Sequence, residues 1–289
     1  MPRSSLRKLL RGGNRREFAR LNRPPADNRF LTGNGFAACC GVTLNYGPPR
    51  VNRSGRPEWW FCKADRLDEL FAEHAPDSEI VLVTHNSDLS IDEKLAGYLD
   101  SISIRAWFAS NLEFDDPRLR AIPVGIANPH WPHGDQQTLG RVQETASRKS
   151  RLFDVSFSLT SNVDERSYCV EQTGLRPTAP KPYEAYLHDL SQAYFCISPR
   201  GNGIDCHRTW ESLYLRTIPI VTRSILTDQH ADLPMIVLDD WSQFAEIDFS
   251  SDLYDRTIGE WRPESLRLAR YLARLDAALD GIGSRGEGG

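Results

Sequence analysis

The sequence predicts an α/β protein that folds as two domains. Apolar runs typical of buried strands, notably at 79–83, 194–197 and 218–221, alternate with segments that have helical patterning. With 289 residues, of which 40% are hydrophobic, the chain is long enough to bury a core in each of two small domains.

Composition limits the class of protein. The formal net charge of -4 and a pI near 6.0 lack the basic footprint of a nucleic-acid binder. No apolar run approaches the roughly 20 residues that a membrane helix needs, and no secretory signal is present. The six cysteines show no Cys-x-x-Cys spacing, which favours buried, reduced thiols. We therefore expect a cytoplasmic protein.

Residues 1–27 form a basic arm unlike the rest of the chain. Between Pro2 and Pro25 eight arginine or lysine residues stand against a single acid, Glu17. The plain interpretation is a disordered, solvated arm. The alternative is peripheral docking on the anionic inner face of a membrane, where each basic residue near the surface contributes roughly 1 kcal/mol.

Residues 28–147 are expected to form the first domain. Its elements are a helix over 65–73, a buried strand over 79–83, a helix from about 92, and strands over 103–109 and 119–124. The first of these strands leads into His85 and Asp88. Because ligands bind at the carboxyl ends of strands in open α/β sheets, we expect these side chains in a cleft. The alternative is a turn that caps the following helix.

Residues 148–280 are expected to form the second domain, after a surface helix within 135–150 whose last residues serve as the linker. A strand over 153–159 leads to Arg166, which is a phosphate-binding candidate or else a solvated arginine at a helix start. A strand over 235–238 and a long packing helix over 263–279 follow, and residues 281–289 are expected to be disordered.

The segment 198–211 has the layout of a phosphate-binding strand, loop and helix start. Pro199, Gly201 and Gly203 prevent regular structure after the 194–197 strand, and Asp205 is a good N-cap for a helix from about 206 to 215. Glycines allow a close approach of the backbone, and a helix N-terminus offers oriented N–H donors to an anion.

Charged side chains strengthen this interpretation. Arg200 and Arg208 can bind phosphate with two parallel hydrogen bonds, and Glu211 suits a ribose diol. His207 shares one helix face with Glu211 because the two are four residues apart. The plain alternative is a glycine loop before an ordinary amphipathic helix. A metal site at Cys206, His207 and Glu211 is not expected, because only two of the ligands are well placed.

The same segment resembles the nucleotide-sugar motif of exostosin-type glycosyltransferases. Three other stretches fit in the expected order, so that the resemblance spans roughly residues 60–245. The four matching stretches are Val83–Asp88, Ile122–Asn128, Ser198–Val221 and Leu233–Trp241.

This resemblance implies a GT-B-like architecture, in which two Rossmann-like domains face a central cleft. It implies an inverting transfer of a sugar from a nucleotide-diphosphate donor to a glycan or other hydroxyl acceptor, without a cofactor or a metal ion. A lipid-linked glycan is one such acceptor. The chain lacks the membrane anchor and stem of eukaryotic exostosins and is shorter, so the sugar and the acceptor do not transfer.

The resemblance places Arg200, His207 and Arg208 at the diphosphate of the donor and Glu211 at its ribose. With the loop residues and the secondary candidate Arg166, the expected donor-binding set comprises Arg166, Arg200, Gly201, Gly203, Asp205, His207, Arg208 and Glu211. The loop at 125–134 supplies Asn128, Trp131 and His133 on the acceptor side, because aromatic rings stack on sugars; a packed loop between domains is the alternative. For the base that deprotonates the acceptor, Asp88 is the first choice and His85 the second.

Two other classes of function remain open from the sequence. A GT-B-like transferase of a non-sugar group would keep the phosphate site and change the acceptor loops. A non-catalytic nucleotide-binding protein would keep the fold without the acids of the cleft.

Overall fold

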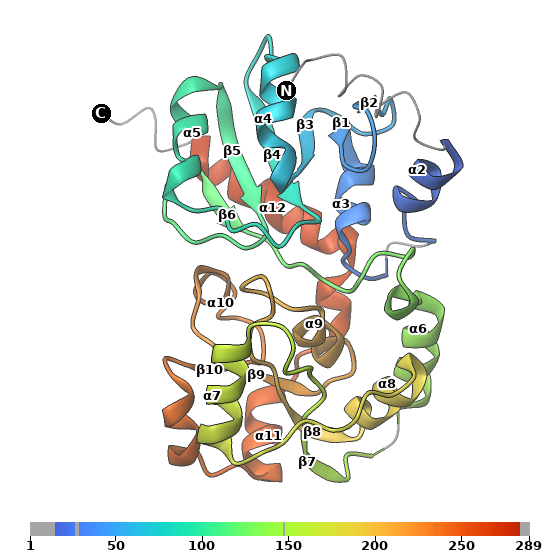
Figure 1. Cartoon of the computed structure of the whole chain (residues 1–289), viewed down its shortest axis with the longest axis vertical. Helices are drawn as coiled ribbons and strands as arrows, with labels where there is room; N and C mark the ends of the chain where they lie inside the picture. The colour runs from blue at the N-terminus through green and yellow to red at the C-terminus, as the bar shows by residue number, and fades with distance from the viewer. Residues whose placement is uncertain (1–14, 27–28, 147, 284–289) are drawn as a thin grey trace.

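A computed structural model describes residues 15–26, 29–146 and 148–283. Within these residues the chain forms a mixed six-stranded sheet and a parallel four-stranded sheet, one in each half of the molecule (Figure 1). Helices cover both sheets. The predicted α/β class is confirmed.

The first sheet has the strand order β2-β1-β3-β4-β5-β6. Its neighbouring strands are parallel except for β1 and β2. The strands are β1 (Cys40–Leu44), β2 (Arg50–Val51), β3 (Arg56–Lys63), β4 (Ile80–His85), β5 (Ile104–Ala109) and β6 (Leu119–Ala121).

Side chains of β4 show how this sheet is packed. All six residues of the strand are buried, as expected for a central parallel strand. Val81 and Val83 join the core beneath α3 (Gly33–Cys39), whereas Ile80 and Leu82 join the core with α4 (Leu67–Glu73) and α5 (Gly97–Ser101) on the other face. The alternation therefore places His85 on the α3 face, where its ring lies 5.8 Å from that of Phe36.

The second sheet has the order β10-β9-β8-β7, with all neighbouring strands parallel. Its strands are β7 (Arg151–Asp154), β8 (Ala193–Ile197), β9 (Ile218–Thr222) and β10 (Ile236–Leu238). The helices of this half are α7 (Val163–Thr173), α8 (Tyr183–Ser191), α9 (His207–Tyr214), α10 (Ile225–Gln229) and α11 (Ser251–Ile258). Short 3₁₀ turns complete the chain at Ala64–Arg66, Glu93–Leu95, Pro132–Gly134, Trp241–Glu246 and Pro263–Leu266.

Two helices connect the halves. Helix α6 (Gln136–Thr145) buries Leu139 and Val142 and leads into the second sheet, which agrees with the predicted surface helix. The last helix, α12 (Leu268–Gly283), instead returns to the first sheet (Figure 1). There the carboxylate of Asp276 accepts two hydrogen bonds from Arg56, at 2.6 and 2.8 Å.

The position of α12 corrects the predicted division of the chain. The sequence grouped 148–280 as one domain, but the final part of that range packs on the other half. The helix also continues through Gly281 to Gly283, so the first residues of the predicted disordered tail are helical. Residues 284–289 lie outside the described residues.

The basic arm also differs from its expected state. Residues 15–21 form helix α2 (Arg15–Leu21). Asn22 donates to the carbonyl of Tyr46 at 2.6 Å, and Asn34 donates to those of Leu21 and Arg23 at 2.8 and 2.9 Å. A disordered state is therefore wrong for 15–26. Residues 1–14, with half of the basic side chains, lie outside the described residues.

Two predicted strands are shorter than expected. Strand β6 ends at Ala121 rather than 124, because its chain then turns toward the other half. Strand β7 ends at Asp154 rather than 159. Beyond it the carbonyl of Val155 accepts from the N–H of Thr178, and Phe157 packs against arginine side chains instead of continuing the sheet.

Candidate functional site

The central motif follows β8 as predicted, but Asp205 does not cap the helix. The N-cap is Cys206, and its side chain caps nothing. The carboxylate of Asp205 instead accepts from the backbone N–H groups of Cys206 and Val124, at 2.7 and 2.9 Å, and from the indole of Trp210 at 2.7 Å. Burial raises the pKa of Asp205 to about 6. Asp205 thus joins the motif to the first half of the molecule.

The loop glycines leave room for neighbouring side chains, and at Gly203 that side chain comes from the other half. A Cβ on Gly203 would lie 2.7 Å from the side chain of Asn111, at the end of β5, and one on Gly201 would lie 3.3 Å from Arg166. The amide oxygen of Asn111 accepts from the N–H of Asp205 at 3.3 Å. These glycines therefore allow neighbouring side chains to approach the loop, a role other than the expected cradle for phosphate.

A cavity of about 700 Å³ lies at the carboxyl ends of the first-sheet strands. We call it the first-sheet pocket. It is lined by Gly33, Tyr46, Lys63, His85, Asn86, Ser87, Asp88, Leu89, Val124, Ile126, Asn128, Trp131, His133 and His207.

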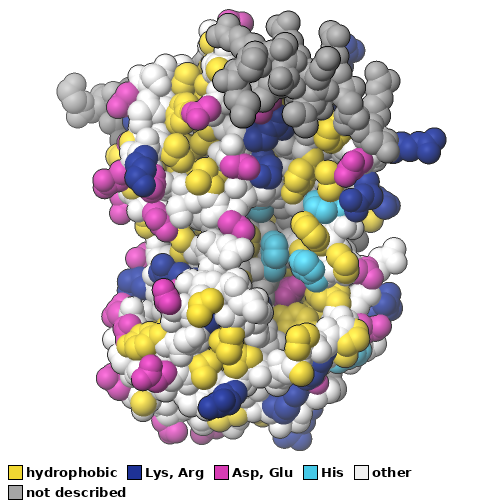
Figure 2. Space-filling model, in the orientation of Figure 1, with side chains coloured by type: hydrophobic (Ala, Val, Ile, Leu, Met, Phe, Trp, Pro, Cys, Tyr) yellow, Lys and Arg dark blue, Asp and Glu magenta, His cyan; other side chains and the backbone are white. Residues whose placement is uncertain are grey.

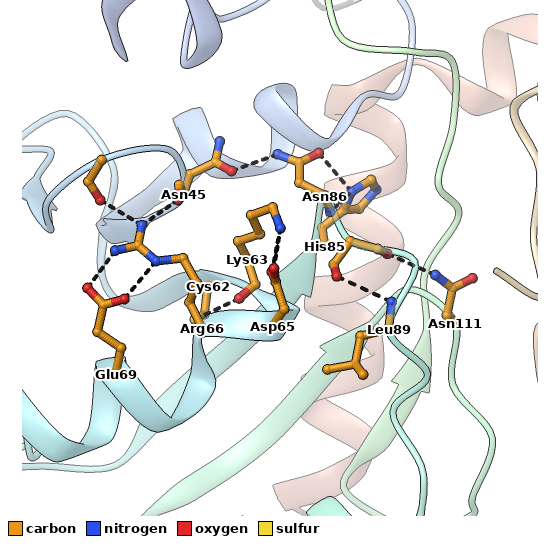
Figure 3. Close-up of polar contacts among 12 residues, drawn as sticks. Asn45, Cys62, Lys63, Asp65, Arg66, Glu69, His85, Asn86, Leu89 and Asn111 are labelled. Carbon is orange, nitrogen blue, oxygen red and sulfur yellow. Dashed lines mark hydrogen bonds and ion pairs between the residues drawn. The ribbon is translucent and has the colours of Figure 1, made fainter. Parts of the chain in front are cut away.

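A network of asparagine amides holds the wall of this pocket. Asn86 donates to Asn34 and Asn45, both at 3.1 Å, and accepts from Asn128 at 2.8 Å. Figure 3 shows Asn86 between Asn45 and His85 at the end of β4. Asn86 adopts a left-handed backbone conformation, with φ 59°. Because each amide is held by others, this part of the wall is rigid and uncharged. Lys63 and Asp88 add one charge of each sign to the lining of the same pocket.

His85 is poorly placed to act as the predicted base. Its Nδ1 accepts from the backbone N–H of Asn86 at 2.6 Å, so its Nε2 carries the proton and donates to the carbonyl of Pro123 at 3.1 Å. Burial lowers the pKa of His85 to about 4. Both ring nitrogens are therefore engaged in holding the fold, which argues against proton transfer.

The other predicted residues of this half do line the pocket. Asp88 is exposed and accepts from Asn202, in the central motif, at 3.2 Å. Asn128 is buried within the amide network. Trp131 is 52% exposed, and its ring stacks at 5.9 Å from that of His133. An indole face that is open to solvent beside a cavity suits the apolar face of a sugar.

A second cavity, of about 870 Å³, lies at the carboxyl ends of the second-sheet strands. We call it the second-sheet pocket. It is lined by Pro132, His133, Ser156, Phe157, Ser158, Leu159, Pro177, Thr178, Ala179, Pro180, Lys181, Pro182, Tyr183, Tyr186, Cys206, His207, Arg208 and Glu211.

Arg208 is a buried cation in the wall of this pocket, and no described carboxylate forms a salt bridge with it. Its side chain donates to the carbonyls of Pro199 and Ser156, at 3.0 and 3.3 Å, while its Nε is buried without a partner among the described residues. The guanidinium lies 5.4 Å from the ring centroid of Phe157. The buried carboxyls of Asp154 and Glu211 interact with Arg208 only at longer range, without a salt bridge. A buried guanidinium whose hydrogen bonds all go to neutral groups can still bind an anionic ligand.

The guanidinium of Arg166 also lies near Phe157, 5.9 Å from the centroid of its ring. It donates to the carbonyls of Ser158 and Arg200 at 2.5 and 2.9 Å. Burial lowers the pKa of Arg166, and the neighbouring charge of Arg208 lowers it further. Two cations thus lie near each other beside the pocket, although Arg166 does not line the cavity itself.

Glu211 lies one turn into α9 and is only 4% exposed. Its carboxylate accepts from the hydroxyls of Tyr183 and Tyr186, at 3.1 and 2.8 Å. Burial raises the pKa of Glu211 to about 7, against the opposing effect of the two tyrosine hydrogen bonds. Sequence reasoning missed these tyrosines, whose i, i+3 spacing on α8 was the available signal.

Arg200 does not join this group. Its Nε donates to the hydroxyl of Thr222 at 3.1 Å, and its Nη2 donates to the carbonyl of Arg223 at 2.6 Å. The side chain lines neither pocket. In this conformation Arg200 fastens the loop to the end of β9, away from the donor-binding position predicted for it.

The two pockets meet at His133 and His207, which line both of them. The two imidazole centroids are 6.3 Å apart. Figure 2 shows histidine side chains gathered in the hollow between the upper and lower halves of the molecule. The structure therefore brings together His133, His207, Arg208 and Glu211 along one continuous cleft.

No cluster of three or more His, Cys, Asp or Glu side chains in the described part of the chain is arranged to hold a metal ion. Among the described helices, none has both the length and the apolar character needed to cross a membrane. All six cysteines are free thiols; Cys39 and Cys206 are partly exposed and the other four are buried.

Comparison with known proteins adds no assignment. A scan against models of protein families finds no match to the chain, and a search of curated proteins finds none either.

Proposed function

We propose that the protein is a glycosyltransferase of the GT-B type that moves a sugar from a nucleotide-diphosphate donor to a hydroxyl acceptor. The observation that carries this proposal is the pair of pockets that meet at His207, one of which holds Arg208 without an ion pair. The resemblance of 198–221 to exostosin-type enzymes supports the same function.

The second-sheet pocket suits the donor. The guanidinium of Arg208, with Arg166 behind it, would face the diphosphate, and Glu211 would accept from the ribose hydroxyls in place of its tyrosine partners. Phe157 and the proline-rich segment 177–182 provide an apolar wall of the kind that accommodates a nucleobase.

The first-sheet pocket suits a neutral, hydroxyl-bearing acceptor such as a glycan. Its amides can exchange hydrogen bonds with hydroxyl groups, and Trp131 offers an exposed ring for stacking. A donor in one pocket and an acceptor in the other would approach the junction from opposite sides. That arrangement favours displacement at the anomeric carbon with inversion.

Charge development on the leaving diphosphate is the difficult part of this reaction. Arg208 and the N-terminus of α9 would stabilise that charge, since preorganised donors aimed at a developing anion lower the barrier. Transfer of a non-sugar group from a similar donor is the second candidate, because Arg208 and Glu211 would recognise the same nucleotide.

A binding and turnover screen tests the proposal. The purified chain is titrated with UDP, GDP, ADP and CMP in a calorimeter, and is then incubated with UDP- and GDP-sugars while released nucleoside diphosphate is measured. We expect one nucleoside diphosphate to bind and its sugar to be hydrolysed slowly. Binding without any turnover would favour a non-catalytic nucleotide-binding protein, and no binding at all would refute the proposal.

Peripheral docking of the basic arm on an anionic membrane is tested in solution, because residues 1–14 lie outside the described residues. Sedimentation with vesicles containing anionic lipid, compared with neutral vesicles, would test peripheral docking by the arm.

A further inference from the structure

His207 is one of two histidines, with His133, whose side chain faces both pockets. It is the first residue of α9 and lines both the first-sheet and the second-sheet pocket. Arg208 follows it directly on the side of the proposed donor. A group at this junction is within reach of the anomeric carbon and of the acceptor hydroxyl.

The contacts of the ring fix its tautomer. Nδ1 lies 2.8 Å from the carbonyl oxygen of Gly125. A carbonyl can only accept a hydrogen bond, so Nδ1 carries the proton and Nε2 has a free lone pair. No other described residue forms a hydrogen bond with Nε2. The loop after β6 thus aims a proton acceptor rather than a donor at the junction.

The surroundings keep this ring neutral. Burial lowers the pKa of His207 and the charge of His133 lowers it further, while the hydrogen bond to the carbonyl of Gly125 and the charge of Asp88 raise it; burial dominates, and the pKa lies below its ordinary value. Position at a helix N-terminus, with its partial positive charge, also disfavours the imidazolium. The other charged or titratable groups nearby are His85, across the first-sheet pocket, Asp205 and Cys206, which precede His207 in the chain, and Arg208 and Glu211 on the same helix. The sequence led us to expect His207 at the diphosphate of the donor. A neutral imidazole would add no positive charge there.

We propose that His207 is the general base of the transfer, taking the proton of the acceptor hydroxyl on Nε2. This inference rests on the proposed function. The acceptor oxygen forms its bond to the anomeric carbon as the bond from that carbon to the diphosphate oxygen breaks. The electron pair of the broken bond leaves with the diphosphate, and the hydroxyl proton passes to Nε2 and then to solvent.

Asp88 becomes a supporting group in this scheme. Its carboxylate stabilises the imidazolium that forms on His207, while its hydrogen bond from Asn202 keeps it at the rim of the cleft. The sequence named Asp88 as the first choice for the base, and this scheme gives that role to His207 instead. His207 receives the proton, and Asp88 favours the charged product of that step.

Two substitutions separate the ring nitrogens. The amide nitrogen of asparagine falls where Nδ1 lies, so His207→Asn keeps the donor to Gly125 and removes the base. His207→Gln places its amide near the position of Nε2 instead. The control is His188→Asn, at an exposed histidine on α8 that lines neither pocket.

The experiment measures nucleoside diphosphate binding by calorimetry, and hydrolysis of the matching UDP- or GDP-sugar across pH 5 to 9, with water as acceptor. We expect His207→Asn to bind the nucleoside diphosphate within about threefold of the unsubstituted chain. Its hydrolysis rate should fall roughly 10²- to 10⁴-fold, the usual contribution of a general base. In His207→Asn and His207→Gln, the fall in kcat/KM toward acidic pH should disappear. Both variants retain Glu211, so a fall caused by the titration of Glu211 would persist. His188→Asn should match the unsubstituted chain.

Three results would overturn the inference. Retained turnover with an unchanged acidic limb in His207→Asn would exclude a base at this position. Binding that weakens as much as turnover would instead make His207 a donor-binding residue, as the sequence suggested. If the unsubstituted chain binds no nucleoside diphosphate, the proposed function fails and the inference fails with it.

Discussion

The two pockets lie at equivalent edges of two parallel sheets, yet they are built from different chemistry. The wall of the second-sheet pocket holds Arg208 and Glu211, both buried and neither in an ion pair with a described residue. The first-sheet pocket is held by neutral amides around Asn86 that satisfy one another. Buried charge without a counter-ion is costly.

This difference indicates that the two pockets select their ligands in different ways. A rigid neutral wall can select a ligand by shape and hydroxyl pattern, whereas uncompensated charge selects a ligand by charge. We expect substitutions in the second-sheet pocket to change nucleotide binding and pH response. Those in the first-sheet pocket should mainly change the stability of the fold.

The largest expected effect is that of Arg208→Ala. Removing one preorganised donor to a developing anion costs about 10²- to 10³-fold in kcat, so nucleotide-sugar hydrolysis should fall by that amount and nucleoside diphosphate binding should weaken. Arg256→Ala, at an exposed arginine on α11, is the matched control. Unchanged nucleoside diphosphate binding in Arg208→Ala would show that the second-sheet pocket does not select its ligand by charge.

Glu211→Gln tests the titration of the same pocket. Folding raises the pKa of Glu211 from an ordinary 4.5 to about 7, so the folded chain keeps a proton that the unfolded chain releases above pH 4.5. The stability due to this proton is present below pH 4.5 and is lost as pH rises through 7. Since one pKa unit corresponds to 1.36 kcal/mol, the loss is about 3 kcal/mol.

Urea unfolding of both chains from pH 4.5 to 8 measures this effect. The unsubstituted chain should lose stability relative to Glu211→Gln across that window, while the contribution of Asp205, present in both, cancels. Parallel stability curves for the two chains would contradict the prediction.

Gly33→Ala is expected to act on the neutral pocket through packing. A Cβ at this position would lie 1.8 Å from the amide oxygen of Asn86 and 2.5 Å from Nδ1 of His85. Because the network holds both side chains, the substitution should destabilise the fold by about 2 kcal/mol, within the range for overpacking. Gly97→Ala, which meets no atom within 4 Å, should be neutral or slightly stabilising in thermal denaturation. Equal melting temperatures for the two variants would show that the amide network can shift to accommodate the added methyl group.

The smallest effect should come from Arg200→Ala. Its guanidinium binds Thr222 and the carbonyl of Arg223 rather than lining a pocket, so nucleoside diphosphate affinity should change by less than about fivefold, roughly 1 kcal/mol. The same calorimetric titration checks this. A loss as large as that of Arg208→Ala would restore Arg200 to the predicted donor site.

Local patterns predicted the frame of the site well. The apolar runs at 194–197 and 218–221 became β8 and β9, and the helix between them became α9, because buried strands and an amphipathic helix carry their signal in adjacent residues. The positions of Arg208 and Glu211 followed from the same pattern.

Directions of side chains and distant partners were not predictable in this way. The tyrosine partners of Glu211 come from α8, at least 25 residues away along the chain, and their i, i+3 spacing places them on one helix face without revealing which residue they contact. Arg200 and Asp205 hold the frame rather than line the predicted donor site, because their partners are Thr222 of β9 and Val124 of the loop after β6. The alternating run at 153–159 leaves the sheet early because Phe157 finds its packing partners in Arg166 and Arg208.

The return of α12 to the first sheet has a mechanical consequence. The backbone passes from the first half to the second before α6, which packs on α8, and passes back before α12, so two covalent connections join the halves. Buried residues of both halves, among them Val81 and Leu213, also belong to one apolar core. Separating the halves would expose that core to water, which opposes a wide opening of the cleft.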